Sequence, residues 1–146
     1  MSELCSVYVF GCPHSHFGHT VKVGISNNVF ARLSSIQSHN AEKVVPHFHF
    51  DLPSRELAFE IEQYFHRRFD SYRIHREWFA MGECQAIYLL SICVVRALSA
   101  RYQGDEHREM REWSGLIKAF AILDAEDSDD VLGWERDWQE TEEVLA

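Results

Sequence analysis

A glutamate and a histidine on one side of a predicted helix are the residues of this sequence best placed for chemistry. Glu62 and His66 share a line with Phe59 and Phe69, at helical spacings of i, i+3, i+7 and i+10. This line borders the apolar residues of the same helix, so Glu62 is expected where the helix meets a sheet. Such a carboxylate suits Mg²⁺, which prefers oxygen ligands and retains several waters. The alternative is a partly buried acid paired with an arginine or with His66.

A second group of possible metal ligands lies in a short segment that also contains glycine and proline. Its members are Cys12, His14, His16 and His19. Cysteine and histidine at this density can bind Zn²⁺. The segment has no second ligand pair, which zinc fingers and knuckles would supply. A polar loop beside a substrate groove, with histidines that contact phosphate, is the alternative interpretation.

Three strands are expected among the first 52 residues. Residues 6–10 and 21–25 are rich in β-branched and aromatic side chains and are joined by a long connection. Residues 44–52 alternate between apolar and polar side chains. Pro46 near the start of this third segment indicates either an edge strand or the entry of a strand, because proline cannot donate a ladder hydrogen bond.

Helices are expected over about residues 28–37, 54–68 and 83–101. Ser54 is a suitable N-cap for the second helix, which carries the Glu62 and His66 line. Residues 72–79, before the third helix, are expected to be extended or irregular. The order of these elements predicts an α+β domain, with a small three-stranded sheet, mixed or antiparallel, flanked by helices.

The net charge of −9 argues against a nucleic-acid-binding protein, because phosphates attract basic surface. The charge is unevenly distributed, however. Residues 1–100 hold nine acidic and nine basic side chains, whereas residues 101–146 hold fourteen acidic and five basic ones. We therefore expect a neutral domain over residues 1–103 and an acidic helical extension over residues 104–146. The extension could dock a partner protein, mimic nucleic acid and restrain the domain, or pack on it as solvated helices.

Two features bear on the compartment. No segment has the basic start and apolar run of a signal peptide, and the most apolar stretch, residues 86–95, is too short to cross a bilayer. The four cysteines form no C-x-x-C pair and no disulfide framework. We therefore expect a cytoplasmic protein with reduced thiols and no membrane association.

Five motifs occur in order along the chain. They are Ser6-Val7-Tyr8, Lys22-Val23-Gly24, Arg32, residues 61–69 around Glu62, and Glu77-Trp78-Phe79. Together they resemble the GIY-YIG nuclease superfamily, in the subgroup typified by a phage T5 open reading frame and a meiotically up-regulated fungal protein. A lysine in place of the leading tyrosine of the second tripeptide is usual in this subgroup. The resemblance covers about residues 6–80, and five motifs in correct order are far more specific than any one alone.

This resemblance implies an endonuclease that hydrolyses DNA with one divalent metal ion, Mg²⁺ or Mn²⁺, with RNA left open as a substrate. By the resemblance Glu62 holds the metal, and Arg32 binds the scissile phosphate and stabilises its charge. Tyr8 accepts a proton from the attacking water, and Lys22 on the paired strand is expected to lower the pKa of this phenol. Substrate contacts are expected from His39, His66 and Glu77.

The alternative is a module of the same fold that binds nucleic acid or protein without cleaving it. Tyr8, Arg32 and Glu62 are all retained, which favours an active enzyme over such a module. A metal-dependent cleavage assay distinguishes the two functions.

Overall fold

The computed structural model of the chain describes residues 4–15 and 18–101. The acidic extension predicted for residues 104–146 lies outside the described residues. The chain divides into two compact units, Met1–Glu83 and Cys84–Ala146, and every predicted site residue belongs to the first. The expected domain boundary at residue 103 stays a prediction.

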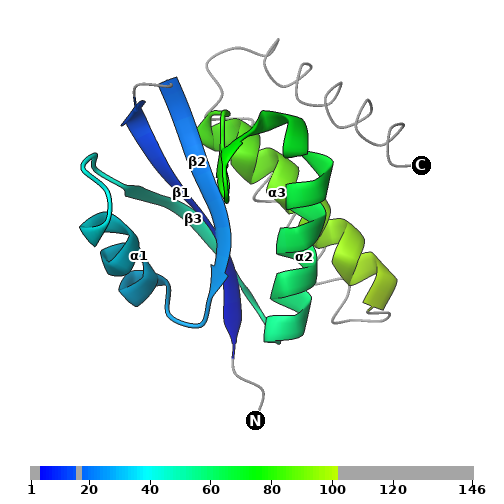
Figure 1. The fold of residues 1–146 in the computed structure, drawn as a ribbon. Coiled ribbons are helices and arrows are strands. Elements are labelled where there is room, and N and C mark those ends of the chain that lie inside the picture. The colour runs from blue at the N-terminus through cyan, green and yellow to red at the C-terminus, as the bar shows by residue number, and fades with distance from the viewer. Residues whose placement is uncertain (1–3, 16–17, 102–146) are drawn as a thin grey trace. The chain divides into compact units, whose positions relative to one another are not determined.

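The first unit contains one antiparallel sheet with the strand order β3-β1-β2-β5-β4 (Figure 1). The strands are β1 (Cys5–Ser15), β2 (Gly18–Ser26), β3 (Val45–Leu52), β4 (Arg73–His75) and β5 (Trp78–Phe79). The α+β class is confirmed, but the prediction of a three-stranded sheet is wrong. The additional strands, β4 and β5, are three and two residues long, which is too short for the alternation of side chains to reveal them.

The predicted pair of strands is a hairpin, but the prediction of a long connection between them is wrong, because β1 continues to Ser15, β2 begins at Gly18, and these two residues pair. Strand β3 adds to the outer side of β1. Tyr8 of β1 lies opposite Gly24 of β2 and opposite His49 of β3. Pro46 therefore lies on an edge strand, as expected. At the edge of β2 that faces away from β1, β5 pairs with only two residues, Val21 and Lys22. The ladder between these two strands does not continue along the rest of β2.

Helices α1 (Val29–Ser38) and α2 (Arg55–Arg68) lie on opposite sides of the strands in Figure 1, and α3 (Glu83–Arg101) follows them in the chain. Helix α1 packs on the sheet face that carries Tyr8 and Phe10. The predicted bounds of α2 are confirmed, and the hydroxyl of Ser54 accepts a hydrogen bond from the backbone N–H of Leu57 at 3.2 Å. Its apolar stripe is fully buried and consists of Leu57, Ile61, Phe65 and Phe69.

Among the described residues, no helix combines the length and the apolarity that a membrane span requires.

Candidate functional site

Gly24 in β2 lies next to two side chains of the candidate site, Tyr8 and Glu77. A Cβ atom at this position would lie 2.5 Å from the Tyr8 Oη and 3.3 Å from the Glu77 Oε2. Both distances are shorter than ordinary van der Waals contact, and the first is impossible without a shift of the phenol. Glycine therefore lets the Tyr8 side chain extend across β2 from the neighbouring strand. The close approach explains why the second tripeptide motif ends in glycine.

The phenol of Tyr8 is fully buried and is joined to Arg32 of α1. The Arg32 Nε donates a hydrogen bond to the Tyr8 Oη at 3.5 Å, a long distance for such a bond. Burial raises the pKa of Tyr8, and the hydrogen bond from Arg32 offsets only part of this rise. The prediction that the pKa of this phenol is lowered is therefore wrong. A buried phenolate loses its hydration, and the pattern of the sequence does not reveal this burial.

Lys22 pairs with Glu77. The Lys22 Nζ lies 2.7 Å from the Glu77 Oε2, and the two side chains are 11% and 32% exposed. The ammonium group also lies over the Trp78 ring, 5.7 Å from its centroid. The backbone holds Glu77 in place, because its carbonyl accepts a hydrogen bond from the Val23 N–H at 3.2 Å. Arg32 and Lys22 thus have different partners, the phenol and this carboxylate.

Glu62 of α2 is 5% exposed and forms no ion pair among the described residues. Its position where the helix meets the sheet is therefore as expected, and the alternative of pairing with an arginine or with His66 finds no support. Burial raises its pKa to about 7, and the charge of Glu77 adds to this rise. A hydrogen bond from Gln63 at 3.3 Å acts in the opposite direction. The charges of Lys22 and Arg55 also lower this pKa, but neither side chain forms an ion pair with Glu62 among the described residues. The site thus contains a buried carboxylate whose desolvation is only partly offset.

A divalent cation fits this donor set. Carboxylate oxygens are the ligands that Mg²⁺ and Mn²⁺ prefer, and a cation beside Glu62 would remove the electrostatic cost of its ionised form. In the part of the chain that the structure describes, there is no group of three or more His, Cys, Asp and Glu side chains that could hold a metal. A cation at Glu62 would therefore retain much of its water, which is the usual behaviour of Mg²⁺.

His66 connects α2 to β2 through a hydrogen bond to the backbone of Val23. Its Nε2 donates to the Val23 carbonyl oxygen at 2.8 Å, just past the residues that pair with β5. The side chain is 5% exposed, and burial lowers its pKa, so that it is neutral at pH 7. Because the imidazole is directed at the backbone, its position fits a residue that positions Glu62, one turn away, better than one that contacts phosphate.

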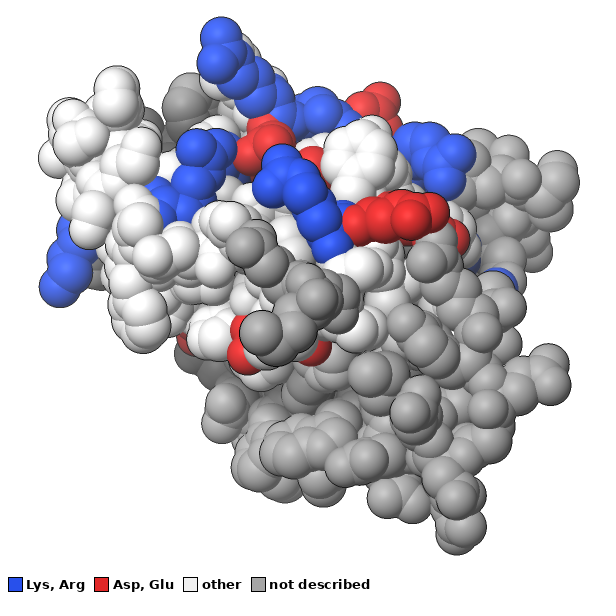
Figure 2. Space-filling model, turned by 90° about the horizontal axis from the view of Figure 1, so that it is seen from below, with Lys and Arg blue, Asp and Glu red and all other residues white. Residues whose placement is uncertain are grey.

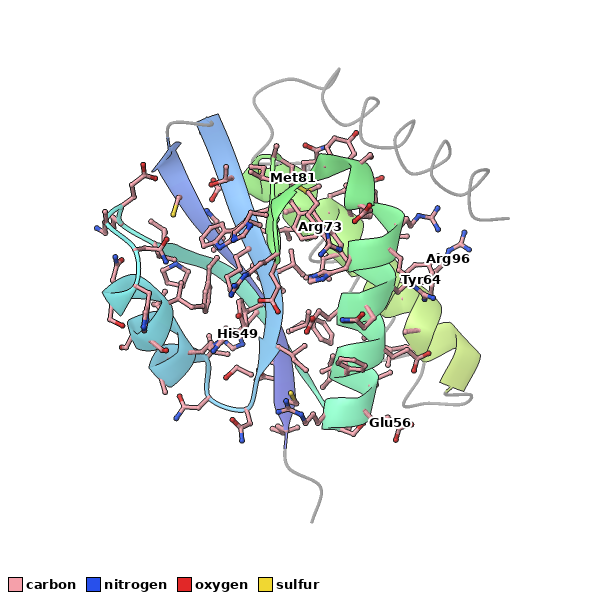
Figure 3. The ribbon with its side chains drawn as sticks, viewed as in Figure 1. His49, Glu56, Tyr64, Arg73, Met81 and Arg96 are labelled. Carbon is pink, nitrogen blue, oxygen red and sulfur yellow. The ribbon has the colours of Figure 1, made fainter. Side chains whose placement is uncertain are left out.

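Arg73 supports the same region from β4, and Figure 3 shows it between α2 and the short strands. Its guanidinium donates to the carbonyl oxygens of Arg76 and His66, at 2.7 and 3.2 Å. Arg76 has a φ of 51°, an uncommon conformation for a residue other than glycine, at the turn that leads to Glu77. The guanidinium therefore fixes both the turn before Glu77 and the end of the helix that carries Glu62.

His39 is not part of these contacts. It forms the C-cap of α1, is exposed, and its Nδ1 lies 2.8 Å from the Ser35 carbonyl oxygen and 3.1 Å from the Ser38 hydroxyl. These bonds are local to the end of the helix. A contact between His39 and substrate stays a prediction.

The predicted zinc ligands are only partly described. Cys12 is buried, and burial raises the pKa of its thiol, which disfavours the thiolate that zinc binds. His19 is exposed. The side chains of His14 and His16 lie outside the described residues, so the zinc hypothesis stays open at those two positions.

The chain matches the T5orf172 domain over residues 6–94, which is more than half of its length. This domain is associated with the GIY-YIG-like nuclease superfamily. No curated protein and no solved structure matches the chain. The match includes all five motifs and the helix that carries Glu62, and the chain belongs to the T5orf172 domain family.

Proposed function

We propose that the chain is an endonuclease that hydrolyses DNA phosphodiester bonds with the help of Mg²⁺ or Mn²⁺. The observation that carries this proposal is Glu62, a buried carboxylate with a pKa of about 7 and no ion-pair partner among the described residues. The family match is compatible with a nuclease or a DNA-binding protein. A bound metal ion would neutralise charge that develops on the phosphate and its leaving group.

The two basic side chains of the site, Arg32 and Lys22, have different roles in this proposal. Arg32 uses its Nε for Tyr8, which leaves the two terminal nitrogens of the guanidinium for a phosphate oxygen. These donors are placed to stabilise the charge of the transition state. Lys22 holds the Glu77 carboxylate in place through their ion pair.

Proton transfer needs a revised assignment, because burial raises the pKa of Tyr8 and makes the phenol a poor base at neutral pH. In this proposal the buried Tyr8 hydroxyl positions the Arg32 guanidinium that binds the phosphate. The Glu77 carboxylate accepts the proton. Like the Tyr8 phenol it lies next to Gly24, and its side chain is partly exposed to solvent. Lys22 remains its ion-pair partner.

The test is cleavage of supercoiled, linear and single-stranded DNA, and of RNA, with Mg²⁺ or Mn²⁺. Glu62→Gln and Arg32→Gln should each reduce the rate by roughly 10²-fold or more, the usual effect of removing one transition-state contact. Glu60→Gln, an exposed acid on the same helix, is the matched control and should cleave like wild type. Cleavage that survives both substitutions would overturn the proposal. Tight binding without cleavage of any substrate would instead identify a non-cleaving module.

A further inference from the structure

We propose that Arg55 and Phe59 of α2 form the surface on which a single strand of nucleic acid continues beyond the cleaved phosphate. This inference rests on the proposed function and specifies its substrate. The two residues precede Glu62 at i−7 and i−3, so all three fall within roughly 60° of one another around the helix. Glu62 and this surface therefore lie along the same side of α2.

Phe59 is the aromatic part of this surface. Its side chain is 54% exposed, whereas the apolar stripe that joins α2 to the rest of the fold is fully buried without it. An exposed aromatic ring is a suitable stacking platform for an unpaired base, because every base has a π-face, and such stacking contributes about 1–3 kcal/mol.

Arg55 is the basic part. It is exposed, forms no ion pair among the described residues, and is near enough to lower the pKa of Glu62 through its charge. It occupies the first position of α2, where the helix dipole disfavours a cation. Neither an ion-pair partner nor helix stability explains a basic residue here. The charge of Arg55 partly offsets that of Glu62, and a bound phosphate group would provide a direct anionic partner.

The spacing of the line fits a nucleic-acid strand. Arg55 and Glu62 are seven residues apart, or about 10 Å along the helix axis. This is the length of roughly three stacked nucleotides at about 3.4 Å each. A phosphate at Arg55, a base on Phe59 and the cleaved phosphate near Glu62 can therefore belong to one short stretch of strand.

The mixed charges around Arg55 and Phe59 favour a contact with a narrow ligand over a broad basic patch. Figure 2 views the end of the molecule where α2 begins and shows Lys and Arg side chains interspersed with acidic ones. Glu56, labelled in Figure 3, and Glu60 occupy the next line of the helix, about 100° further around it. A duplex offers no free base face for Phe59 to stack on, whereas a single strand does. The surface therefore fits a single strand better than a duplex.

The experiment measures binding of the full-length chain to a short fluorescent single-stranded DNA in EDTA, by anisotropy, over a range of salt concentrations. Phe59→Ala should weaken binding by roughly tenfold or more, the equivalent of the lost stacking. Arg55→Gln should reduce the slope of log K against log[salt] by about 0.7, the value for one phosphate contact in a single strand. Each variant is first checked by circular dichroism, and both substitutions are at exposed positions.

Two matched controls come from the same chain. Phe30→Ala removes an aromatic ring that is 76% exposed on α1, and Arg67→Gln removes an exposed arginine at another angle of α2. Both should bind like wild type. Wild-type affinity for Phe59→Ala and Arg55→Gln, or an equal loss in the controls, would overturn the inference. Because binding is measured without metal, a chain that fails to cleave would refute the proposed function and leave this result intact.

Discussion

Replacing Glu62 by glutamine should stabilise the metal-free protein at alkaline pH. Burial and the charge of Glu77 raise the pKa of Glu62 from 4.5 to about 7 in the folded chain. Between these two values the folded state holds a proton that the unfolded state has lost. The free energy of unfolding therefore falls as pH rises from 4.5 through 7, by at most about 1.4 kcal/mol per pH unit. The total loss is about 3 kcal/mol and is complete near pH 8.

Glutamine at position 62 carries no titrating charge and avoids this loss. In EDTA at pH 8, Glu62→Gln should therefore be more stable than wild type by up to about 3 kcal/mol, and the advantage should vanish near pH 4.5. Urea unfolding of both proteins across this pH range measures the difference. Mg²⁺ should stabilise wild type at pH 8 and leave the variant unchanged, because a ligand that binds only the folded state adds its binding free energy to stability.

A control and a second substitution isolate the cause. Glu60→Gln, exposed on the same helix, should keep the pH trend of wild type. Glu77→Gln should move the Glu62 transition to lower pH, because the charge of Glu77 is the second cause of the raised pKa. Two outcomes would contradict the raised pKa of Glu62: a stability advantage of Glu62→Gln that is the same at every pH, or no advantage at pH 8.

Two further substitutions test the framework of the site. Gly24→Ala would place a Cβ atom 2.5 Å from the Tyr8 Oη and should destabilise the protein by about 1–3 kcal/mol, whereas Gly82→Ala, with nothing within 4 Å of the added atom, should leave the melting temperature unchanged. His66→Leu leaves the Val23 carbonyl without its hydrogen bond and should cost about 1–3 kcal/mol in urea unfolding, and His66→Gln, whose amide can donate, should recover part of this loss. Equal stability of the leucine and glutamine variants would mean that the bond to Val23 is not what holds this histidine.

The elements with long repeating patterns were predictable from the sequence. Helix α2 has Ser54 at its N-cap and four apolar residues spaced one turn apart, and the structure begins and ends this helix as predicted. Strands β4 and β5 were not predictable, because a strand of two or three residues has no measurable alternation. Their pairing depends on the edge of β2, which is contributed by residues more than 50 positions earlier in the chain.

Part of the candidate site was predictable, and part depended on tertiary contacts. The helical spacing of Glu62 already indicated a place at the border of the apolar face, and its burial confirms this. The partners of the two cations depend on the folded arrangement: Lys22 contacts Glu77, and Arg32 contacts Tyr8. The direction of the pKa shift of Tyr8 likewise depends on burial. The spacing of Arg55 and Glu62 was visible in the sequence, but the exposure of Arg55 was not.

The charges on α2 are more consistent with ligand binding than with stability. A helix selected for stability alone would carry neither a buried carboxylate that lacks an ion-pair partner among the described residues, as Glu62 does, nor an arginine in its first turn. A bound cation would compensate the charge of the Glu62 carboxylate, and a bound anion would compensate the charge of Arg55. A metal ion and a phosphodiester strand bring both, at a separation of about 10 Å along one helix line. Each unfavourable charge is therefore accounted for by a different part of the same substrate complex, which is why the two proposals support each other while their tests remain independent.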